Sequence, residues 1–78
     1  MVMVNFYAAA RSAIGNDQLQ VEASTLQELI LILNNQNDLM RKILPCCSYL
    51  LNSQVCHEKT QILMEADQID VLPKFAGG

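Results

Sequence analysis

The stretch Ser24-Thr25-Leu26-Gln27-Glu28-Leu29-Ile30-Leu31-Ile32-Leu33 decides the fold, because the spacing of apolar residues changes there from alternating to helical. Ser24 is a good N-cap residue, and Gln27 three positions later completes a capping-box pattern. One apolar stripe follows at helical spacing: Leu26, Leu29, Ile30 and Leu33. The pattern predicts a helix that begins after Ser24 and buries one face in a core.

The residues before this helix alternate between two faces, which predicts strands. The alternation covers Val2–Ala8 and returns over Gln18–Ala23. Between them, Ala9–Asn16 has no clear period and is interpreted as a connection, with Gly15-Asn16-Asp17 as a turn signal. Two strands joined in this way indicate an antiparallel hairpin that precedes the helix.

The residues after the helix predict further strands and one short helix. The helix ends near Asn34-Asn35, Asn52-Ser53 forms a turn, and Ile62, Leu63 and Met64 are expected to point inward from a connection. The elements expected here are a helix over Asp38–Ile43, strands over Cys46–Leu51 and Gln54–His57, a connection over Glu58–Asp67, and a last strand over Gln68–Leu72. The order ββ-α-ββ-β indicates an α+β domain, in which a mixed sheet carries one main helix on one face.

Composition narrows the range of partners. The chain has 78 residues, enough for one domain, and a net charge of −3 with its bases scattered along the sequence. Without a basic stripe, nucleic acid is not expected as a partner. Hydrophobic residues make up 51% of the chain, so part of the apolar surface is expected to be covered by another protein. No apolar run approaches the length of a membrane span, so no membrane partner is expected.

The cysteines are expected to be reduced thiols. The N-terminal residues show no secretory signal, and three cysteines are an odd number, which together favour a cytoplasmic protein. Cys46, Cys47, Cys56 and His57 are the conceivable zinc ligands. Adjacent residues of a strand point to opposite faces, and the usual spacing of zinc-binding cysteines is missing. We therefore expect no metal site, buried thiols and a surface histidine.

The chain ends in Gly77-Gly78, after a strand and Pro73. Glycine packs nothing and is the most expensive residue to order, so it is unusual at the end of a domain. A glycine pair forms a thin extension that can enter a channel too narrow for any Cβ atom. We expect a folded domain over residues 1–72 and a flexible tail over residues 73–78.

Several segments, in order, resemble the small subunit of molybdopterin synthase, a sulfur carrier of the ThiS/MoaD-like group. The opening Val4-Asn5-Phe6-Tyr7-Ala8-Ala9-Ala10-Arg11, followed by Gly15, resembles the first strand and loop of that family. Asn52 after Tyr49-Leu50-Leu51 resembles the end of its third strand. The run Leu63–Pro73 resembles the segment before its tail, and the family also ends in Gly-Gly. The resemblance covers essentially the whole chain and implies a ubiquitin-like β-grasp fold.

The resemblance implies a carrier that is itself a tethered substrate and a non-catalytic subunit. An E1-like adenylating enzyme, supplied with ATP and Mg²⁺, would activate the carboxylate of Gly78 beside Gly77, and a sulfur donor would convert it to a thiocarboxylate. The large subunit of molybdopterin synthase would then receive the tail within a heterotetramer. No permanently bound cofactor is implied, because the reacting group is the chain end itself.

Two arguments identify a partner-binding surface. Val2, Val4 and Phe6 occupy one face of the first strand, so Met3 and Tyr7 should face outward, and the same parity places Leu72 outward on the last strand. The resemblance adds Val55 and Phe75 beside this face. The complete expected surface is Met3, Tyr7, Val55, Leu72 and Phe75.

The chain departs from the family pattern near its tail, which leaves other pathways open. Ala66 replaces a glycine, and alanine resists positive φ, so the turn before the last strand is expected to differ in type. Lys74 replaces a second proline. The alternatives are a related carrier for thiamine, cysteine or tRNA thiolation, and a ubiquitin-like modifier whose Gly78 ends in an isopeptide bond to lysine.

Overall fold

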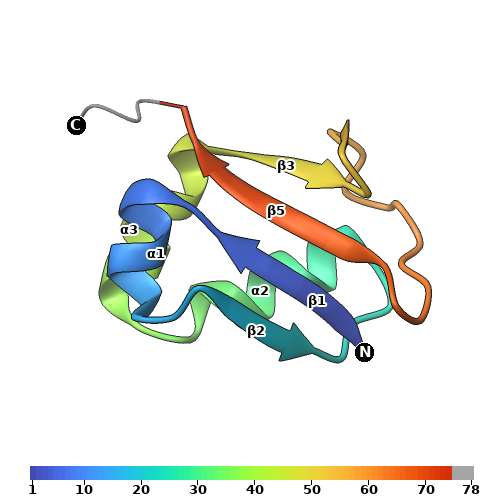
Figure 1. Ribbon diagram of the computed structural model, residues 1–78, viewed down its shortest axis with the longest axis horizontal. Helices are drawn as coiled ribbons and strands as arrows, with labels where there is room; N and C mark the ends of the chain where they lie inside the picture. The colour runs from blue at the N-terminus through green and yellow to red at the C-terminus, as the bar shows by residue number, and fades with distance from the viewer. Residues whose placement is uncertain (75–78) are drawn as a thin grey trace.

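The computed structural model describes residues 1–74, which form one mixed sheet with helices packed against it (Figure 1). Its elements are β1 (Val2–Phe6), α1 (Ala8–Ile14), β2 (Gln18–Val21), α2 (Leu26–Asn34), α3 (Asp38–Ile43), the 3₁₀ turn η1 (Leu44–Cys46), β3 (Cys47–Leu51), β4 (Gln54–Val55) and β5 (Gln68–Pro73). No helix within residues 1–74 is long and apolar enough to cross a bilayer.

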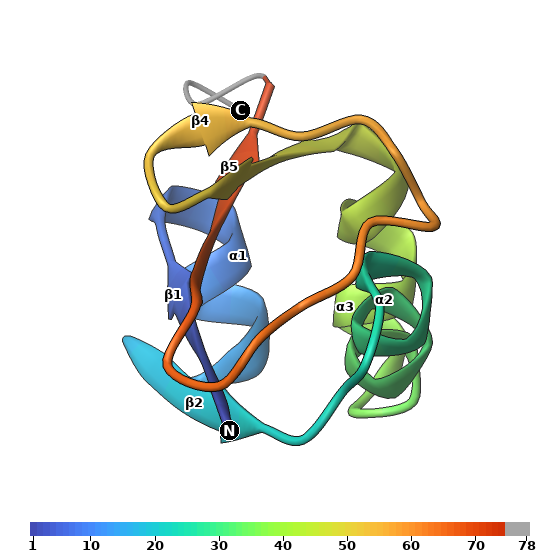
Figure 2. The same cartoon turned by 90° about the vertical axis from the view of Figure 1, so that its right-hand side faces the viewer.

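The sheet has the strand order β2-β1-β5-β3-β4. The first and last strands, β1 and β5, lie side by side and parallel, whereas all other neighbours are antiparallel. Figure 2 shows α2 and α3 on one side of this sheet. The arrangement is an α+β, β-grasp fold, so the predicted fold class is confirmed.

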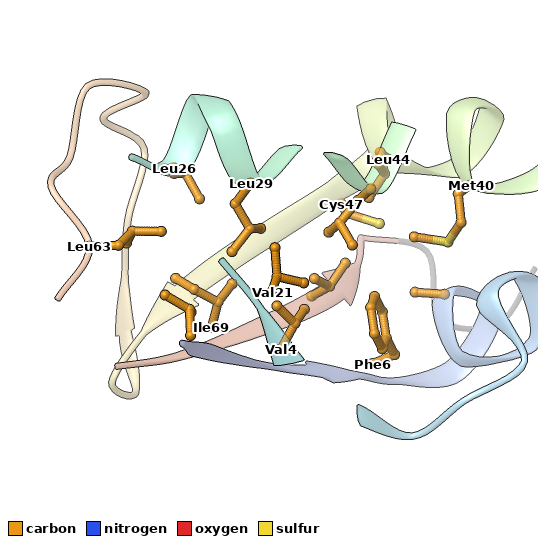
Figure 3. Close-up of a cluster of buried hydrophobic side chains, with 14 of the residues drawn as sticks. Val4, Phe6, Val21, Leu26, Leu29, Met40, Leu44, Cys47, Leu63 and Ile69 are labelled. Carbon is orange, nitrogen blue, oxygen red and sulfur yellow. The ribbon is translucent and has the colours of Figure 1, made fainter. Parts of the chain in front are cut away.

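The core lies between the sheet and α2, as the alternating pattern predicts (Figure 3). Every second strand residue faces it, and Val4, Ile69 and Val71 are completely buried. From α2, Leu29 and Leu33 are also completely buried, which confirms the predicted apolar stripe. Within residues 1–74, no buried side chain is polar or charged, so burial of apolar area is what holds the domain together.

The segment between the first two strands is a helix, where the sequence analysis expected an irregular connection. Helix α1 begins after Tyr7 and buries Ala10 completely. It ends at Gly15, whose φ of 82° lets its N–H bond the Arg11 carbonyl at 2.8 Å. Because alanine has the highest helix propensity, Ala9 and Ala10 favour a helix here, whereas Ala8, with a φ of 51°, does not adopt the right-handed helical conformation.

Helix α2 begins one residue later than predicted. Thr25, not Ser24, is the N-cap, and its hydroxyl accepts the Glu28 N–H at 3.2 Å. The Glu28 carboxylate in turn accepts the Ser24 N–H at 2.7 Å. Thr25 and Glu28 therefore cap the helix, with the Glu28 carboxylate bonding the residue before the N-cap, and Gln27 has no part in these bonds. The short helix predicted over Asp38–Ile43 is confirmed as α3.

The predicted turn at Asn52-Ser53 joins β3 to β4. Both residues have positive φ, 48° and 74°, which suits the right-handed twist of a two-residue hairpin. The return strand β4 is shorter than expected and covers only Gln54–Val55. One further contact continues the pairing, since the Cys56 N–H donates to the Tyr49 carbonyl at 2.9 Å.

The connection before β5 differs from the prediction in two ways. Leu63 is buried, but Ile62 and Met64 are 58% and 64% exposed, because a segment without regular structure has no periodicity from which faces can be assigned. Ala66 adopts a positive φ of 70°, although its Cβ disfavours this conformation. Asp67 closes this turn by accepting the Met64 N–H at 2.7 Å.

Candidate functional site

Strand β5 positions the end of the chain. It is the middle strand of the sheet, and its last residue, Pro73, pairs with Cys47 of β3. One residue later, the Lys74 N–H donates to the Cys46 carbonyl at 2.8 Å. The sheet therefore holds the first two residues of the expected tail. Phe75, Gly77 and Gly78 lie outside the described residues, so their expected roles remain predictions.

The strand register defines an outer face, opposite α2. Asn5 pairs with Asp70, and Asp70 pairs on its other side with Leu50, so one row of side chains crosses the central strands. The strand residues on this face are Gln18, Gln20, Met3, Asn5, Gln68, Asp70, Leu72, Ser48, Leu50 and Val55. The predicted outward orientation of Met3 and Leu72 agrees with their alternation against the buried residues of β1 and β5.

The part of this face over β2, β1 and β5 is polar. The Gln18 amide donates to Asn5 Oδ1 at 2.8 Å, and the Asn5 amide donates to Asp70 Oδ1 at 2.8 Å. The Asn5 amide also lies 3.3 Å from Gln68 Oε1. We name these four residues, Gln18, Asn5, Gln68 and Asp70, the polar ladder. It fixes the rotamers of side chains that would otherwise move freely on an exposed sheet.

Apart from Ser48, the part over the end of β5, over β3 and over β4 is apolar. Leu50 lies between Asp70 and Val55 in the register, and Leu72 pairs with Ser48 one row away. Val55 is 61% exposed, and Tyr7, which follows the end of β1, is 42% exposed. Leu50, Leu72, Val55 and Tyr7 are named the apolar cluster. Leu72 lies near the end of β5 at which the chain leaves the sheet, whereas Leu50 and Val55 lie in the row of Asp70.

The structure thus brings together most, but not all, of the predicted partner-binding residues. Met3 faces outward but pairs with Gln68 near the start of β5, so the polar ladder separates it from Leu72. Leu50 was missed, although the alternation within Cys47–Leu51 would have placed it on the face opposite the buried Cys47. The polar ladder had no sequence signal, because Asn5 and Asp70 are joined only by the long-range register of β1 and β5.

The three cysteines differ in environment. Cys47 and Cys56 are buried, as expected, but Cys46 is exposed, because it ends the 3₁₀ turn before the strand begins. Burial, and to a lesser degree Cys46, raises the pKa of Cys47 to about 11. The Cys47 thiol donates to the Ile43 carbonyl at 3.3 Å. Across residues 1–74, His, Cys, Asp and Glu side chains form no cluster that could hold a metal ion.

Sequence comparison places this fold in a known family. The profile of the ThiS family matches residues 4–78. The chain belongs to the ThiS family. Its members are sulfur carriers or ubiquitin-like modifiers of the ThiS/MoaD type, which is the coarse function that the match supports. No curated protein sequence matches the chain.

Solved structures similar to this ThiS-family chain include proteins from bacteria and archaea. The complex of subunits 1 and 2 of the molybdopterin-converting factor from Helicobacter pylori 26695 contains a chain 27% identical to it, with a TM-score of 0.77 and coverage of 99% and 97% of the two chains. The small archaeal modifier protein 1 from Methanosarcina acetivorans is 19% identical, with a TM-score of 0.86 and coverage of 99% and 95%. The BexX/CysO complex of Amycolatopsis orientalis contains a chain 17% identical, with a TM-score of 0.80 and full coverage of both chains. The last two show the fold alone.

Proposed function

We propose that this protein is the small, sulfur-donating subunit of a molybdopterin synthase. The observation that carries the proposal is the 27% identity over nearly the whole length to a chain of the Helicobacter pylori molybdopterin-converting factor complex. The structure of the small archaeal modifier is similar in fold but less similar in sequence, at 19% identity. A carrier therefore has better support than a protein modifier.

The chemistry belongs to the carboxylate of Gly78, with Gly77 before it. A free carboxylate is a poor electrophile, because neither oxygen is a good leaving group. An adenylating enzyme with bound ATP and Mg²⁺ would form an acyl-adenylate and release pyrophosphate. A persulfide sulfur would then attack the carbonyl carbon and expel AMP, and a thiol would cleave the resulting S–S bond to leave a thiocarboxylate. The carrier supplies no acid, base or metal to these steps.

The outer face would serve as the docking surface for the large synthase subunit and for the adenylating enzyme. Its apolar cluster, Leu50, Leu72, Val55 and Tyr7, reaches the end of β5 at Leu72, so a protein covering it would also lie beside the point at which the chain leaves the sheet. Met3 would contribute from the far side of the polar ladder, and Phe75 would act as an anchor near the tail. Two ThiS-like chains in the comparison are present in complexes with another protein, which supports a heterologous partner.

Intact-mass measurement tests the proposal. Incubation with the adenylating enzyme, ATP, Mg²⁺ and a sulfur donor should raise the mass by about 16 Da, the exchange of one oxygen for sulfur at an activated acyl group. Deletion of Gly78 should abolish the gain while leaving the unfolding temperature unchanged. The thiocarboxylated protein, mixed with the large subunit, should then convert the molybdopterin precursor.

Two results would contradict the proposal. A mass gain that survives deletion of Gly78 would place the sulfur elsewhere in the chain. Attachment to lysine side chains of other proteins, with no transfer of sulfur to the molybdopterin precursor, would identify a ubiquitin-like modifier.

A further inference from the structure

The outer face contains one charged strand residue in the described part of the chain, and it lies at the centre. Asp70 belongs to β5, the middle strand, and is flanked in the register by Asn5 and Leu50. Along its own strand its neighbours on this face are Gln68 and Leu72. Whatever protein covers this face must therefore cover Asp70 as well.

Only one of the two oxygens of the Asp70 carboxylate has a hydrogen-bond partner within residues 1–74. The Asn5 amide donates to Oδ1 at 2.8 Å, and the Tyr7 hydroxyl lies 3.5 Å from the same oxygen, at the long limit for a hydrogen bond. No hydrogen bond or ion pair reaches Oδ2 from any residue between 1 and 74. Asp70 is only partly buried, so water can reach its carboxylate in the free protein.

A partner that removes this water must replace it. A carboxylate buried without a compensating group is strongly unfavourable, and the centre of an interface is where water is excluded most completely. A cation satisfies the free oxygen and also offsets the cost of burying the charge. A neutral or apolar surface would leave the carboxylate uncompensated at the most costly position.

We propose that Asp70 is a specificity-determining residue, which selects partners that place an arginine or lysine against Oδ2 when they cover the apolar cluster. The inference rests on the proposed function, because it concerns the protein that activates the chain end. The polar ladder supports it, because the Asn5 amide bonds Oδ1 while Oδ2 has no partner among residues 1–74. The partner considered is the adenylating enzyme, since both a carrier and a modifier begin with adenylation.

The inference is tested by the direction in which one substitution changes the affinity for the adenylating enzyme. Asp70→Asn keeps the shape and the contact with Asn5 but removes the charge. If a cation faces Asp70, binding of the full-length variant to the adenylating enzyme of the same organism should weaken by about tenfold or more, the scale for truncating one member of a buried charge pair. If a neutral or apolar group faces it, the same substitution should leave binding unchanged or strengthen it, which would overturn the inference.

Salt dependence and a matched control complete the experiment. Calorimetric titration between about 0.05 and 0.5 M salt should show a steeper loss of affinity for the wild type than for Asp70→Asn.

Asp38→Asn removes the same charge from α3, on the opposite side of the sheet, and should leave affinity nearly unchanged (Figure 2). Equal losses in the two variants would show a general charge effect and overturn the assignment to Asp70. A wild type that the enzyme neither binds nor adenylates would overturn the proposed function together with this inference.

Discussion

The two faces of the central strands differ in what they contain, although the same strands supply both. Toward α2, β1 and β5 present only apolar side chains, and Val4 and Ile69 are completely buried. On the other side, Asn5 and Asp70 occupy the neighbouring positions, and the Asn5 amide donates a hydrogen bond to the Asp70 carboxylate. A single alternating sequence thus supplies the apolar side chains of the core on the inner face and the surface proposed for partner binding on the outer face.

The largest effect is expected from a substitution that creates a cavity on the inner face. Leu29→Ala should lower the free energy of unfolding by about 2–5 kcal/mol, because Leu29 is completely buried and its removal leaves a void. Leu31→Ala, on the exposed side of the same helix, should change it by less than about 0.5 kcal/mol. Urea unfolding of both variants measures the difference. Equal losses would mean that α2 does not bury one face alone.

The corresponding test on the outer face concerns binding. Leu72→Glu should weaken binding to the large synthase subunit by about tenfold or more, because a charge replaces an apolar contact in the middle of the apolar cluster. Unfolding of the free protein should be nearly unchanged. Leu39→Glu makes the same change at an exposed position of α3 and should not affect binding. A variant that loses stability but keeps its affinity would show that Leu72 belongs to the core.

Cys46 and Cys47 are adjacent in sequence, but only Cys47 is buried, so they allow a second comparison of a core position with a surface position. Cys47→Ser should cost about 1–3 kcal/mol, the price of an imperfectly bonded hydroxyl in the core, whereas Cys46→Ser should be almost neutral. With its pKa near 11, the Cys47 thiol should also resist alkylation at neutral pH, while Cys46 reacts. Sulfur uptake at Gly78 should survive replacement of Cys46, Cys47 and Cys56 together. A folded triple variant that takes up no sulfur would contradict this.

The smallest effect concerns the turn before β5. The Met64 N–H and, next, the Asn52 amide lower the pKa of Asp67. A carboxylate whose pKa is lower in the folded than in the unfolded state stabilises the fold above its unfolded pKa, and the effect is lost as pH falls through the folded value. Between about pH 5 and pH 2, the wild type should therefore lose more stability than Asp67→Asn. Identical pH profiles would show that these bonds do not favour the charged form.

Local pattern was sufficient to predict most of the scaffold. Alternation gave the strands around Val4 and Ile69 and the face that each residue occupies, and helical spacing gave α2. The misses have physical causes. Ala8–Ile14 is a helix whose propensity was overlooked, and Ile62 and Met64 lie in a segment without a period.

The candidate site was less predictable than the scaffold. Parity gave the outward orientation of Tyr7 and Leu72, but the bond between Asn5 and Asp70 depends on pairing across 65 positions. No local rule gives the register of two strands so far apart. The polar ladder, and with it the inference about the partner's charge, required the structure.

The position of β5 has a consequence for synthesis of the protein. It is the middle strand of the sheet and, among the strands of residues 1–74, the last to be synthesised, so β1 and β3 have no common neighbour until residues 68–73 have been made. A nascent chain that stops before this point cannot close its sheet and is left to the proteases that remove unfolded chains. Under the proposed function, chains that stop before β5 therefore cannot occupy the adenylating enzyme as folded competitors that lack Gly78.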